Sequence, residues 1–213
     1  MAIKLIEFPN PNGSLPLRVA KGHFATSHSH INYYVDLAIP KYRLSEAREA
    51  ARHLAGKYKM GTVVDTILCL DGTEVLGACI ARELSDSSRM SMNNLKSINV
   101  VTPEHTTGSQ LLFRENVVPM IEGQHVLVLA ASIATGFTVQ GGIEAITYYG
   151  GTPVGVCSIS ASVDECCGFP VNAVFNTKQV MADYFSKPYS ECPLCKAGVK
   201  VDAIVNTYGF SSF

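Results

Sequence analysis

The residue types best suited to chemistry follow the most apolar stretch of the chain, residues 125–131. Residues 134–138 read Ala-Thr-Gly-Phe-Thr, and a helical pattern begins directly after them. Gly136 permits a tight turn, and the first N–H groups of a helix have no partner within it. With the hydroxyls of Thr135 and Thr138, these donors predict a cradle for a monophosphate. The alternative is an ordinary capped helix start, because Thr and Ser are common cap residues. The phosphate-binding candidates are Ser132, Ala134, Thr135, Gly136, Phe137 and Thr138.

A second pattern, Cys192-Pro-Leu-Cys195, lies near the C-terminus. A CxxC turn of this kind can wrap Zn²⁺, but a structural zinc needs four ligands. The only other clustered thiols are Cys166 and Cys167, and adjacent cysteines seldom bind one ion together. A redox CxxC opens a helix after a strand in a thioredoxin-like unit, and that context is missing. We therefore interpret the segment as a structural turn near an oligomer contact and assign no metal to the chain.

Aromatic and imidazole side chains gather in the N-terminal region. Tyr33 and Tyr34 could stack on a base or a nicotinamide-like ring, and the alternative is that they pack a strand against the core. His28 and His30 could contact a ligand or a metal, although histidines in a loop are more often solvated.

The elements that must position these groups alternate between strands and helices. Apolar residues recur at helical spacing over 44–58, 75–84 and 139–146, and apolar runs of strand length cover 63–70, 97–101, 125–131, 152–160 and 171–175. Continuous apolar strands alternating with helices form a parallel sheet covered on both faces. The prediction is an open, mainly parallel, doubly wound α/β sheet. We expect a small N-terminal flap or hood over residues 1–40, a core over 41–190 and a C-terminal extension over 191–213.

Composition excludes several classes of protein. Seventeen Lys and Arg residues against eighteen Asp and Glu residues leave a net charge of −1, which argues against nucleic acid as a partner. A hydrophobic content of 47% excludes disorder, and only 16% of residues are charged, which suggests apolar surface covered by a second copy. No apolar run approaches the roughly 20 residues of a membrane-spanning helix, and the start lacks a signal-peptide core. We expect no membrane partner, a cytoplasmic location and reduced cysteines.

The segment from Val126 to Thr138, VLVLAASIATGFT, resembles the thirteen-residue phosphoribosyl-diphosphate (PRPP) motif of the type I phosphoribosyltransferases. In that motif four apolar residues and two acids precede a Thr-Gly-x-Thr-like turn. Within the superfamily the chain looks most like orotate phosphoribosyltransferase, because GHFATSHSHINYYVD, residues 22–36, is similar to that family's N-terminal pattern. The strand–turn–helix over 64–83 also falls where the family has its diphosphate loop.

The resemblance implies a Rossmann-like phosphoribosyltransferase fold, a homodimer and, with Mg²⁺, transfer of ribose-5-phosphate between diphosphate and a base in pyrimidine biosynthesis. It also implies roles for particular residues. These are Asp71, Gly72 and Thr73 in the diphosphate loop, Tyr33 and Tyr34 in the hood over the base, and His105 as the catalytic residue of a mobile loop.

The sequence departs from the family's pattern where transfer chemistry is carried. Ala130 and Ala131 replace the two acids that hold the ribose hydroxyls, and each lost charge-assisted hydrogen bond is worth about 1.5–3 kcal/mol. The loop region, residues 97–125, has one cation against three acids. Asp71 and Glu74 would repel a diphosphate. Two hypotheses follow: an orotate phosphoribosyltransferase-like enzyme, or a catalytically inactive protein that senses or sequesters a nucleotide or another small phosphoester.

Overall fold

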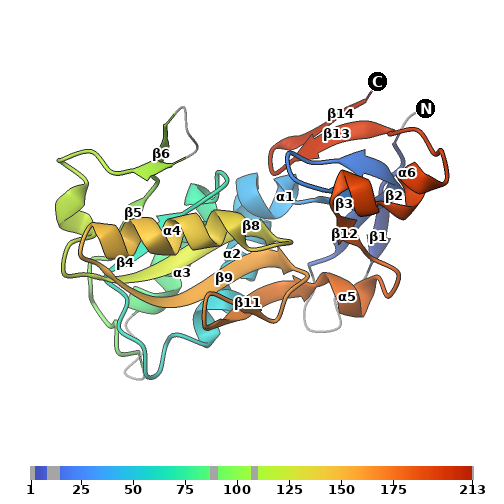
Figure 1. Ribbon diagram of the computed structural model, residues 1–213. Helices are drawn as coiled ribbons and strands as arrows, with labels where there is room; N and C mark the ends of the chain where they lie inside the picture. Colours follow the sequence, from blue (N-terminus) through green and yellow to red (C-terminus); the bar gives the residue numbers. More distant parts are fainter. Residues whose placement is uncertain (1–2, 9–14, 87–90, 107–109, 213) are drawn as a thin grey trace.

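The computed structural model describes residues 3–8, 15–86, 91–106 and 110–212. Its main body is a six-stranded sheet with helices on both faces (Figure 1). Five strands are parallel and the short edge strand β10 is antiparallel. In spatial order they are β10 (Glu165–Cys166), β11 (Phe169–Asn176), β9 (Thr152–Ala161), β8 (His125–Ile133), β4 (Thr66–Cys69) and β5 (Asn99–Val101).

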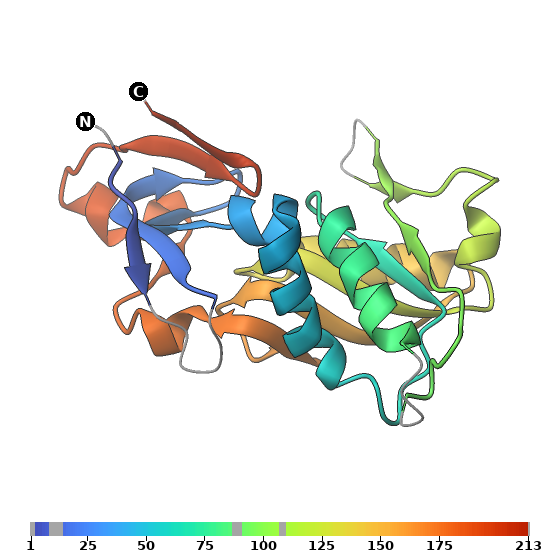
Figure 2. The same cartoon turned by 180° about the vertical axis from the view of Figure 1, so that it is seen from behind.

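Two apolar clusters fill the two faces of this sheet. Helices α2 (Leu44–Gly56) and α3 (Glu74–Ser85) cover one face, as seen in Figure 2, and α4 (Phe137–Tyr148) covers the other, as seen in Figure 1. Along β8, Leu127 and Leu129 belong to the cluster with α2 and α3, whereas Val126 and Val128 belong to the cluster with α4. Because both faces are buried, the strand is apolar at every position from Val126 to Ala131, which is why it stands out in the sequence.

A second six-stranded sheet forms the hood over one end of the main body (Figure 1). Its order is β12-β3-β2-β13-β14, with β1 also paired to β2. The strands are β1 (Ile6–Phe8), β2 (Leu17–Ala25), β3 (His30–Asp36), β12 (Ser186–Lys187), β13 (Ala203–Asn206) and β14 (Gly209–Ser212). The N-terminal region and the C-terminal extension, which we predicted as separate units, therefore share one sheet.

The connections between the sheets are short helices and turns. Pro40 lies in the first turn of α1 (Ala38–Tyr42), where proline is tolerated. The region 97–125, which the resemblance predicted as a loop, contains β6 (Glu104–His105), which pairs with β7 (Leu111–Leu112). Residues 107–109 of that prediction lie outside the described residues. The remaining elements are η1 (Val118–Met120), α5 (Thr177–Val180), η2 (Tyr189–Glu191) and α6 (Pro193–Lys196).

None of the helices among the described residues is both long enough and apolar enough to cross a lipid bilayer.

Candidate functional site

A cavity of about 270 Å³ lies between the carboxyl ends of the parallel strands and the hood. Asp71 follows β4, Ser132 lies near the end of β8, and Thr177 follows β11. From the hood, Tyr34 and Thr207 form part of the opposite wall. Ligands of open parallel sheets bind beyond the carboxyl ends of the strands, so the cavity is at the place where the fold favours a site.

The predicted phosphate cradle opens into this cavity. All of its candidate residues line the wall: Ser132, Ala134, Thr135, Gly136, Phe137 and Thr138. Gly136 is the N-cap of α4, with a φ of 87°, and no side chain caps the helix. Within the part of the chain that the structure describes, no backbone acceptor binds the N–H groups of residues 135–139. The helix therefore does not begin with a side-chain cap, which was the alternative. Its unpaired amides lie at the end of the helix that borders the cavity.

Contacts behind the cradle explain why its turn requires glycine. A Cβ on Gly136 would lie 2.7 Å from the Cys166 sulfur, and the positive φ strains any other residue. The turn is also held from the neighbouring segment. The Ser162 amide donates to the Ile133 carbonyl at 2.9 Å, and its hydroxyl donates to the Ala134 carbonyl at 3.0 Å. The carbonyl groups are thus tied to the protein and the turn is fixed in place.

At the predicted diphosphate turn, Asp71 contributes a half-buried carboxyl group to the cavity wall. Burial raises the pKa of Asp71 above its usual value. The charges of Lys41 and His105, and hydrogen bonds from the Ala131 amide and the Thr207 hydroxyl, act in the opposite direction. The structure thus brings His105, the predicted loop histidine, within electrostatic range of the turn. Asp71 is the only carboxylate among the described residues that line the cavity.

Lys41 is a cation of this site that sequence reasoning missed. Its side chain is fully buried, and its Nζ donates to the Thr207 carbonyl at 2.8 Å. The same Nζ lies 4.7 Å from the centre of the Tyr208 ring and 5.0 Å from that of Tyr42. Nothing in the local sequence marks this lysine, because its contacts come from the far end of the chain.

The other two residues of the predicted diphosphate loop have different surroundings. Gly72 has a φ of 73°, consistent with a tight turn. Thr73 is fully buried, and its hydroxyl donates to the Leu70 carbonyl at 2.8 Å. Its hydroxyl is therefore used to hold the turn at the start of α3.

The tyrosine pair lines the cavity and also packs within the hood. The Tyr33 hydroxyl donates to Asp183 at 2.7 Å. Tyr34 packs against Phe24 and Phe210, and burial raises the pKa of Tyr34 to about 12. These contacts match the packing alternative, while the role of either ring in covering a base stays a prediction.

Comparisons with known proteins identify the architecture. No family model matches the chain. Orotate phosphoribosyltransferase of Chlorobaculum parvum is 28% identical over 187 residues, which cover 85% of this chain and 86% of that protein. Leishmania donovani UMP synthase matches with a TM-score of 0.56 at 17% identity, over 85% of this chain and 36% of that one. Mycobacterium tuberculosis orotate phosphoribosyltransferase, solved with Fe(III) dicitrate, matches with a TM-score of 0.53 at 18% identity, over 78% of this chain and 93% of that one.

The chain has the type I phosphoribosyltransferase fold. An adenine phosphoribosyltransferase from Thermoanaerobacter pseudethanolicus shares it as well, with a TM-score of 0.53 at 15% identity over 81% of this chain and 95% of that one. The predictions of an α/β fold of this superfamily and of similarity to orotate phosphoribosyltransferase are therefore confirmed.

In this phosphoribosyltransferase fold the substituted acid positions, Ala130 and Ala131, are both fully buried. Ala130 packs in the cluster under α4, and Ala131 packs in the cluster under α2 and α3. The Ala131 amide is the group that donates to the Asp71 carboxylate. The Asp71 carboxylate thus lies beside the end of β8, where the PRPP motif that this segment resembles has its two acids.

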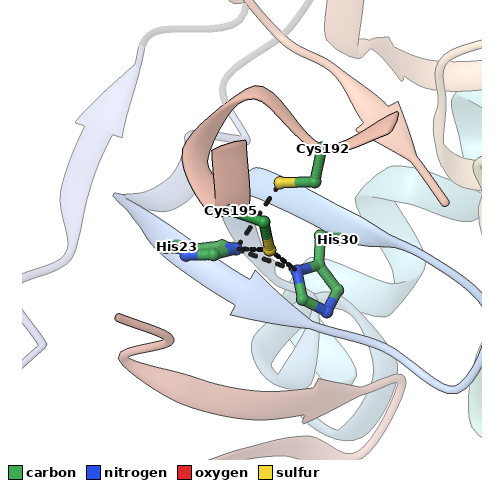
Figure 3. A group of neighbouring side chains, drawn as sticks. All are labelled: His23, His30, Cys192 and Cys195. Carbon is green, nitrogen blue, oxygen red and sulfur yellow. Dashed lines mark hydrogen bonds between the residues drawn. The ribbon is translucent and has the colours of Figure 1, made fainter. Parts of the chain in front are cut away.

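The CxxC turn has neighbours that the sequence analysis did not foresee. Cys192 and Cys195 lie with His23 and His30, and the ligand atoms of all four residues are within 4.8 Å of one another (Figure 3). The expectation that the turn lacks further ligands was based on thiols alone and is wrong. His28, the other histidine we singled out, is exposed, and its ring centre is 6.2 Å from that of Phe137 at the cradle.

Proposed function

We propose that the cavity binds a nucleotide, or a phosphoester of similar size, through its 5′-phosphate. The observation that carries this proposal is the row of unpaired amides of residues 135–139 at the start of α4, beside the cavity. Amide donors and the positive end of a helix favour a phosphate, and each charge-assisted hydrogen bond contributes about 1.5–3 kcal/mol. A volume of about 270 Å³ favours one small ligand over a dinucleotide.

The comparisons support the ligand class. Mycobacterium tuberculosis orotate phosphoribosyltransferase, solved in complex with PRPP, matches with a TM-score of 0.52 at 17% identity over 69% of this chain and 82% of that one. A phosphoribosyl ligand carries the 5′-phosphate that the cradle fits, so nucleoside monophosphates such as UMP are the first ligands to test.

We further propose that the chain has lost efficient diphosphate transfer. The ribose clamp is replaced by two buried alanines, which offer no acceptor to a sugar hydroxyl. At the diphosphate turn, the Asp71 carboxyl faces the cavity and repels a second anionic group when it is ionised. The protein then acts as a binding protein that senses or sequesters its ligand.

A second candidate function is orotate phosphoribosyltransferase activity, and one observation favours it. Asp71 accepts a hydrogen bond from the Ala131 amide and lies close enough to His105 for their charges to interact. Mg²⁺ commonly binds through one or two carboxylates together with substrate phosphates, and Asp71 offers one such carboxylate. Bound there, Mg²⁺ would supply positive charge to the leaving diphosphate. Asp71 would hold the ion, and the amides of residues 135–139 would hold the 5′-phosphate.

Two assays on the same preparation separate these functions. Thermal stability is measured with UMP, inorganic phosphate, diphosphate and PRPP, and orotate absorbance is followed with PRPP and Mg²⁺. Stabilisation by UMP without loss of orotate supports the binding function. Loss of orotate that disappears in Asp71→Asn supports the enzyme. If none of the four compounds raises the melting temperature and orotate is unchanged, the start of α4 is not a phosphate site and both proposals fail.

We also propose a homodimer in a reducing, cytoplasmic environment. None of the seven cysteines forms a disulfide, which suits a reducing compartment. Tyr42, Leu44 and Tyr208 are exposed large apolar side chains that a second copy would cover. Sedimentation equilibrium tests the dimer, and a monomer at micromolar concentration would contradict it.

A further inference from the structure

Four metal-ligating side chains converge in the hood (Figure 3), and none of them is among the described residues that line the cavity. His23 belongs to β2 and His30 begins β3, so the two imidazoles come from one hairpin. Cys192 and Cys195 flank the start of α6, about 170 residues further along the chain. Two thiols and two imidazoles are the donor set of Cys₂His₂ zinc sites.

The distances between the donor atoms fit tetrahedral coordination. The His23 Nε2 atom lies 3.6 Å from each of the two cysteine sulfurs, and the Cys195 sulfur lies 3.2 Å from the His30 Nδ1 atom. Zinc bonds of about 2.3 Å to sulfur and about 2.0–2.1 Å to nitrogen place sulfur and nitrogen about 3.6 Å apart in a tetrahedron. The two nitrogens are 2.9 Å apart, against about 3.3 Å expected for such a site. Four of the six distances between donor atoms are therefore within a few tenths of an ångström of a tetrahedral site, and the other two are no longer than 4.8 Å.

A backbone contact determines the tautomer of the His23 imidazole. Its Nδ1 atom lies 2.9 Å from the Val199 carbonyl oxygen, which can only accept a hydrogen bond. The Nδ1 atom therefore carries the proton, and the lone pair of Nε2 faces the other three donors. A histidine that binds a metal usually donates its second N–H to a carbonyl or carboxylate in this way. Val199 follows the CxxC turn closely, so the turn supplies both the thiols and the group that orients His23.

The backbone on both sides is built to hold these side chains. The register between β2 and β3 shifts between Lys21 and Phe24, and such an irregularity re-aims a side chain. The His23 amide donates to the Asp202 carboxylate at 2.8 Å, while the Asp202 amide donates to the His23 carbonyl at 2.7 Å. A side chain at Gly22 would have its Cβ 2.7 Å from that carboxylate oxygen. The segment after the CxxC turn is thus clamped directly to the strand that bears His23.

The turn itself directs both thiols to one side. The Lys196 amide donates to the Cys192 carbonyl at 3.1 Å, and the Gly198 amide donates to the Cys195 carbonyl at 3.0 Å. Gly198 then reverses the chain with a φ of 71°. Cys192 is fully buried, so its sulfur is shielded from solvent.

We propose that His23, His30, Cys192 and Cys195 bind one Zn²⁺ ion. Because the protein supplies all four ligands, the ion is structural and has no open position for a substrate. It would join the β2–β3 hairpin to the C-terminal segment that continues into β13, and Thr207 just beyond β13 lines the cavity. The ion would therefore fix one wall of the cavity without contacting its ligand.

The test uses the full-length protein without a histidine tag. Elemental analysis after gel filtration in the presence of reductant is expected to find one zinc per chain. Zinc X-ray absorption should give two sulfurs at about 2.3 Å and two nitrogens at about 2.0 Å. The protein refilled with Co²⁺ should show the visible absorption of a tetrahedral ion with thiolate ligands.

Variants then assign the ligands. Cys195→Ser and His30→Ala should each weaken zinc binding by more than about 100-fold, since changes to groups that merely orient a ligand already cost about 10–100-fold. His53→Ala and Cys167→Ser change the same residue types at exposed positions outside the cluster and should retain one zinc. Reduced, folded protein without metal that gains no Co²⁺ spectrum, or full zinc content in Cys195→Ser, would overturn the proposal. Both results are independent of whether the cavity binds UMP.

Discussion

Replacing Gly136 by alanine tests the cradle most directly. Two costs are expected from the structure. The first is backbone strain, because Gly136 has a φ of 87° and a left-handed conformation costs an ordinary residue about 1–2 kcal/mol. The second is steric, because the new Cβ would lie 2.7 Å from the Cys166 sulfur and the turn must move. Overpacking of this kind costs about 1–3 kcal/mol.

Gly168 provides a matched control for the backbone cost. Its φ is 82°, and a Cβ there would meet nothing within 4 Å. Gly168→Ala should therefore lower the free energy of unfolding by about 1–2 kcal/mol, the strain alone. Gly136→Ala should lower it by about 2–5 kcal/mol, the sum of strain and overpacking. Removing the sulfur with Cys166→Ala in the Gly136→Ala background should recover about 1 kcal/mol or more.

Urea unfolding measures these stabilities, and calorimetric titration with UMP measures the function. Displacement of the turn moves the amides that hold the phosphate, so Gly136→Ala should bind UMP at least about tenfold more weakly, since 1.4 kcal/mol is a factor of ten. Gly168→Ala should bind it as the wild type does. Equal destabilisation of the two alanine variants would refute the steric reasoning. Unchanged UMP affinity in a Gly136→Ala protein that shows the additional destabilisation would refute the assignment of the cradle.

Two further predictions concern charged groups. Burial would raise the pKa of Asp65, but its ion pair with Lys96 at 2.7 Å and hydrogen bonds from His125 outweigh this and lower the pKa to about 2. The resulting stability is present above the unfolded value of 3.8 and is lost as the pH falls towards 2. Asp65→Asn should thus cost about 1 kcal/mol at pH 7, allowing for solvent screening, and much less near pH 2, as urea titrations at several pH values would reveal. Lys41→Met removes a fully buried cation and should cost about 3 kcal/mol, with at least about 1 kcal/mol recovered in the double variant with Asp71→Asn. Strictly additive losses would contradict the coupling.

The central sheet could be predicted because its signals are local. The run from Val126 to Ala131 is apolar at every position, as a strand buried on both faces requires. The turn at the start of α4 was also predictable, because residues 134–138 form it from one continuous segment, while its role in binding a phosphate stays a prediction. Their position at a strand end then placed them beside the cavity without any knowledge of the hood.

The zinc cluster and the Lys41 contacts could not be predicted, because they depend on pairing between distant segments. His23 lies within the register shift of β2 and is 3.6 Å from the Cys192 sulfur, and the local sequence at Gly22 and His23 does not predict that shift. Lys41 is buried because Thr207 and Tyr208 return to it from the other end of the chain. Spacing rules that look for ligands near one another in sequence find the CxxC pair, but neither the two histidines that join it nor the contacts of Lys41.

The pairing of β13 with β2 imposes an order on biosynthesis. The strands of the main body all precede residue 177, so that body can fold while the ribosome is still adding the C-terminal segment. The N-terminal strand β2, although made early, gains its β13 neighbour only when residues 203–204 have emerged. The wall that the hood contributes to the cavity is therefore completed last. A nascent chain released before that point would expose the amides at the start of α4 without this wall.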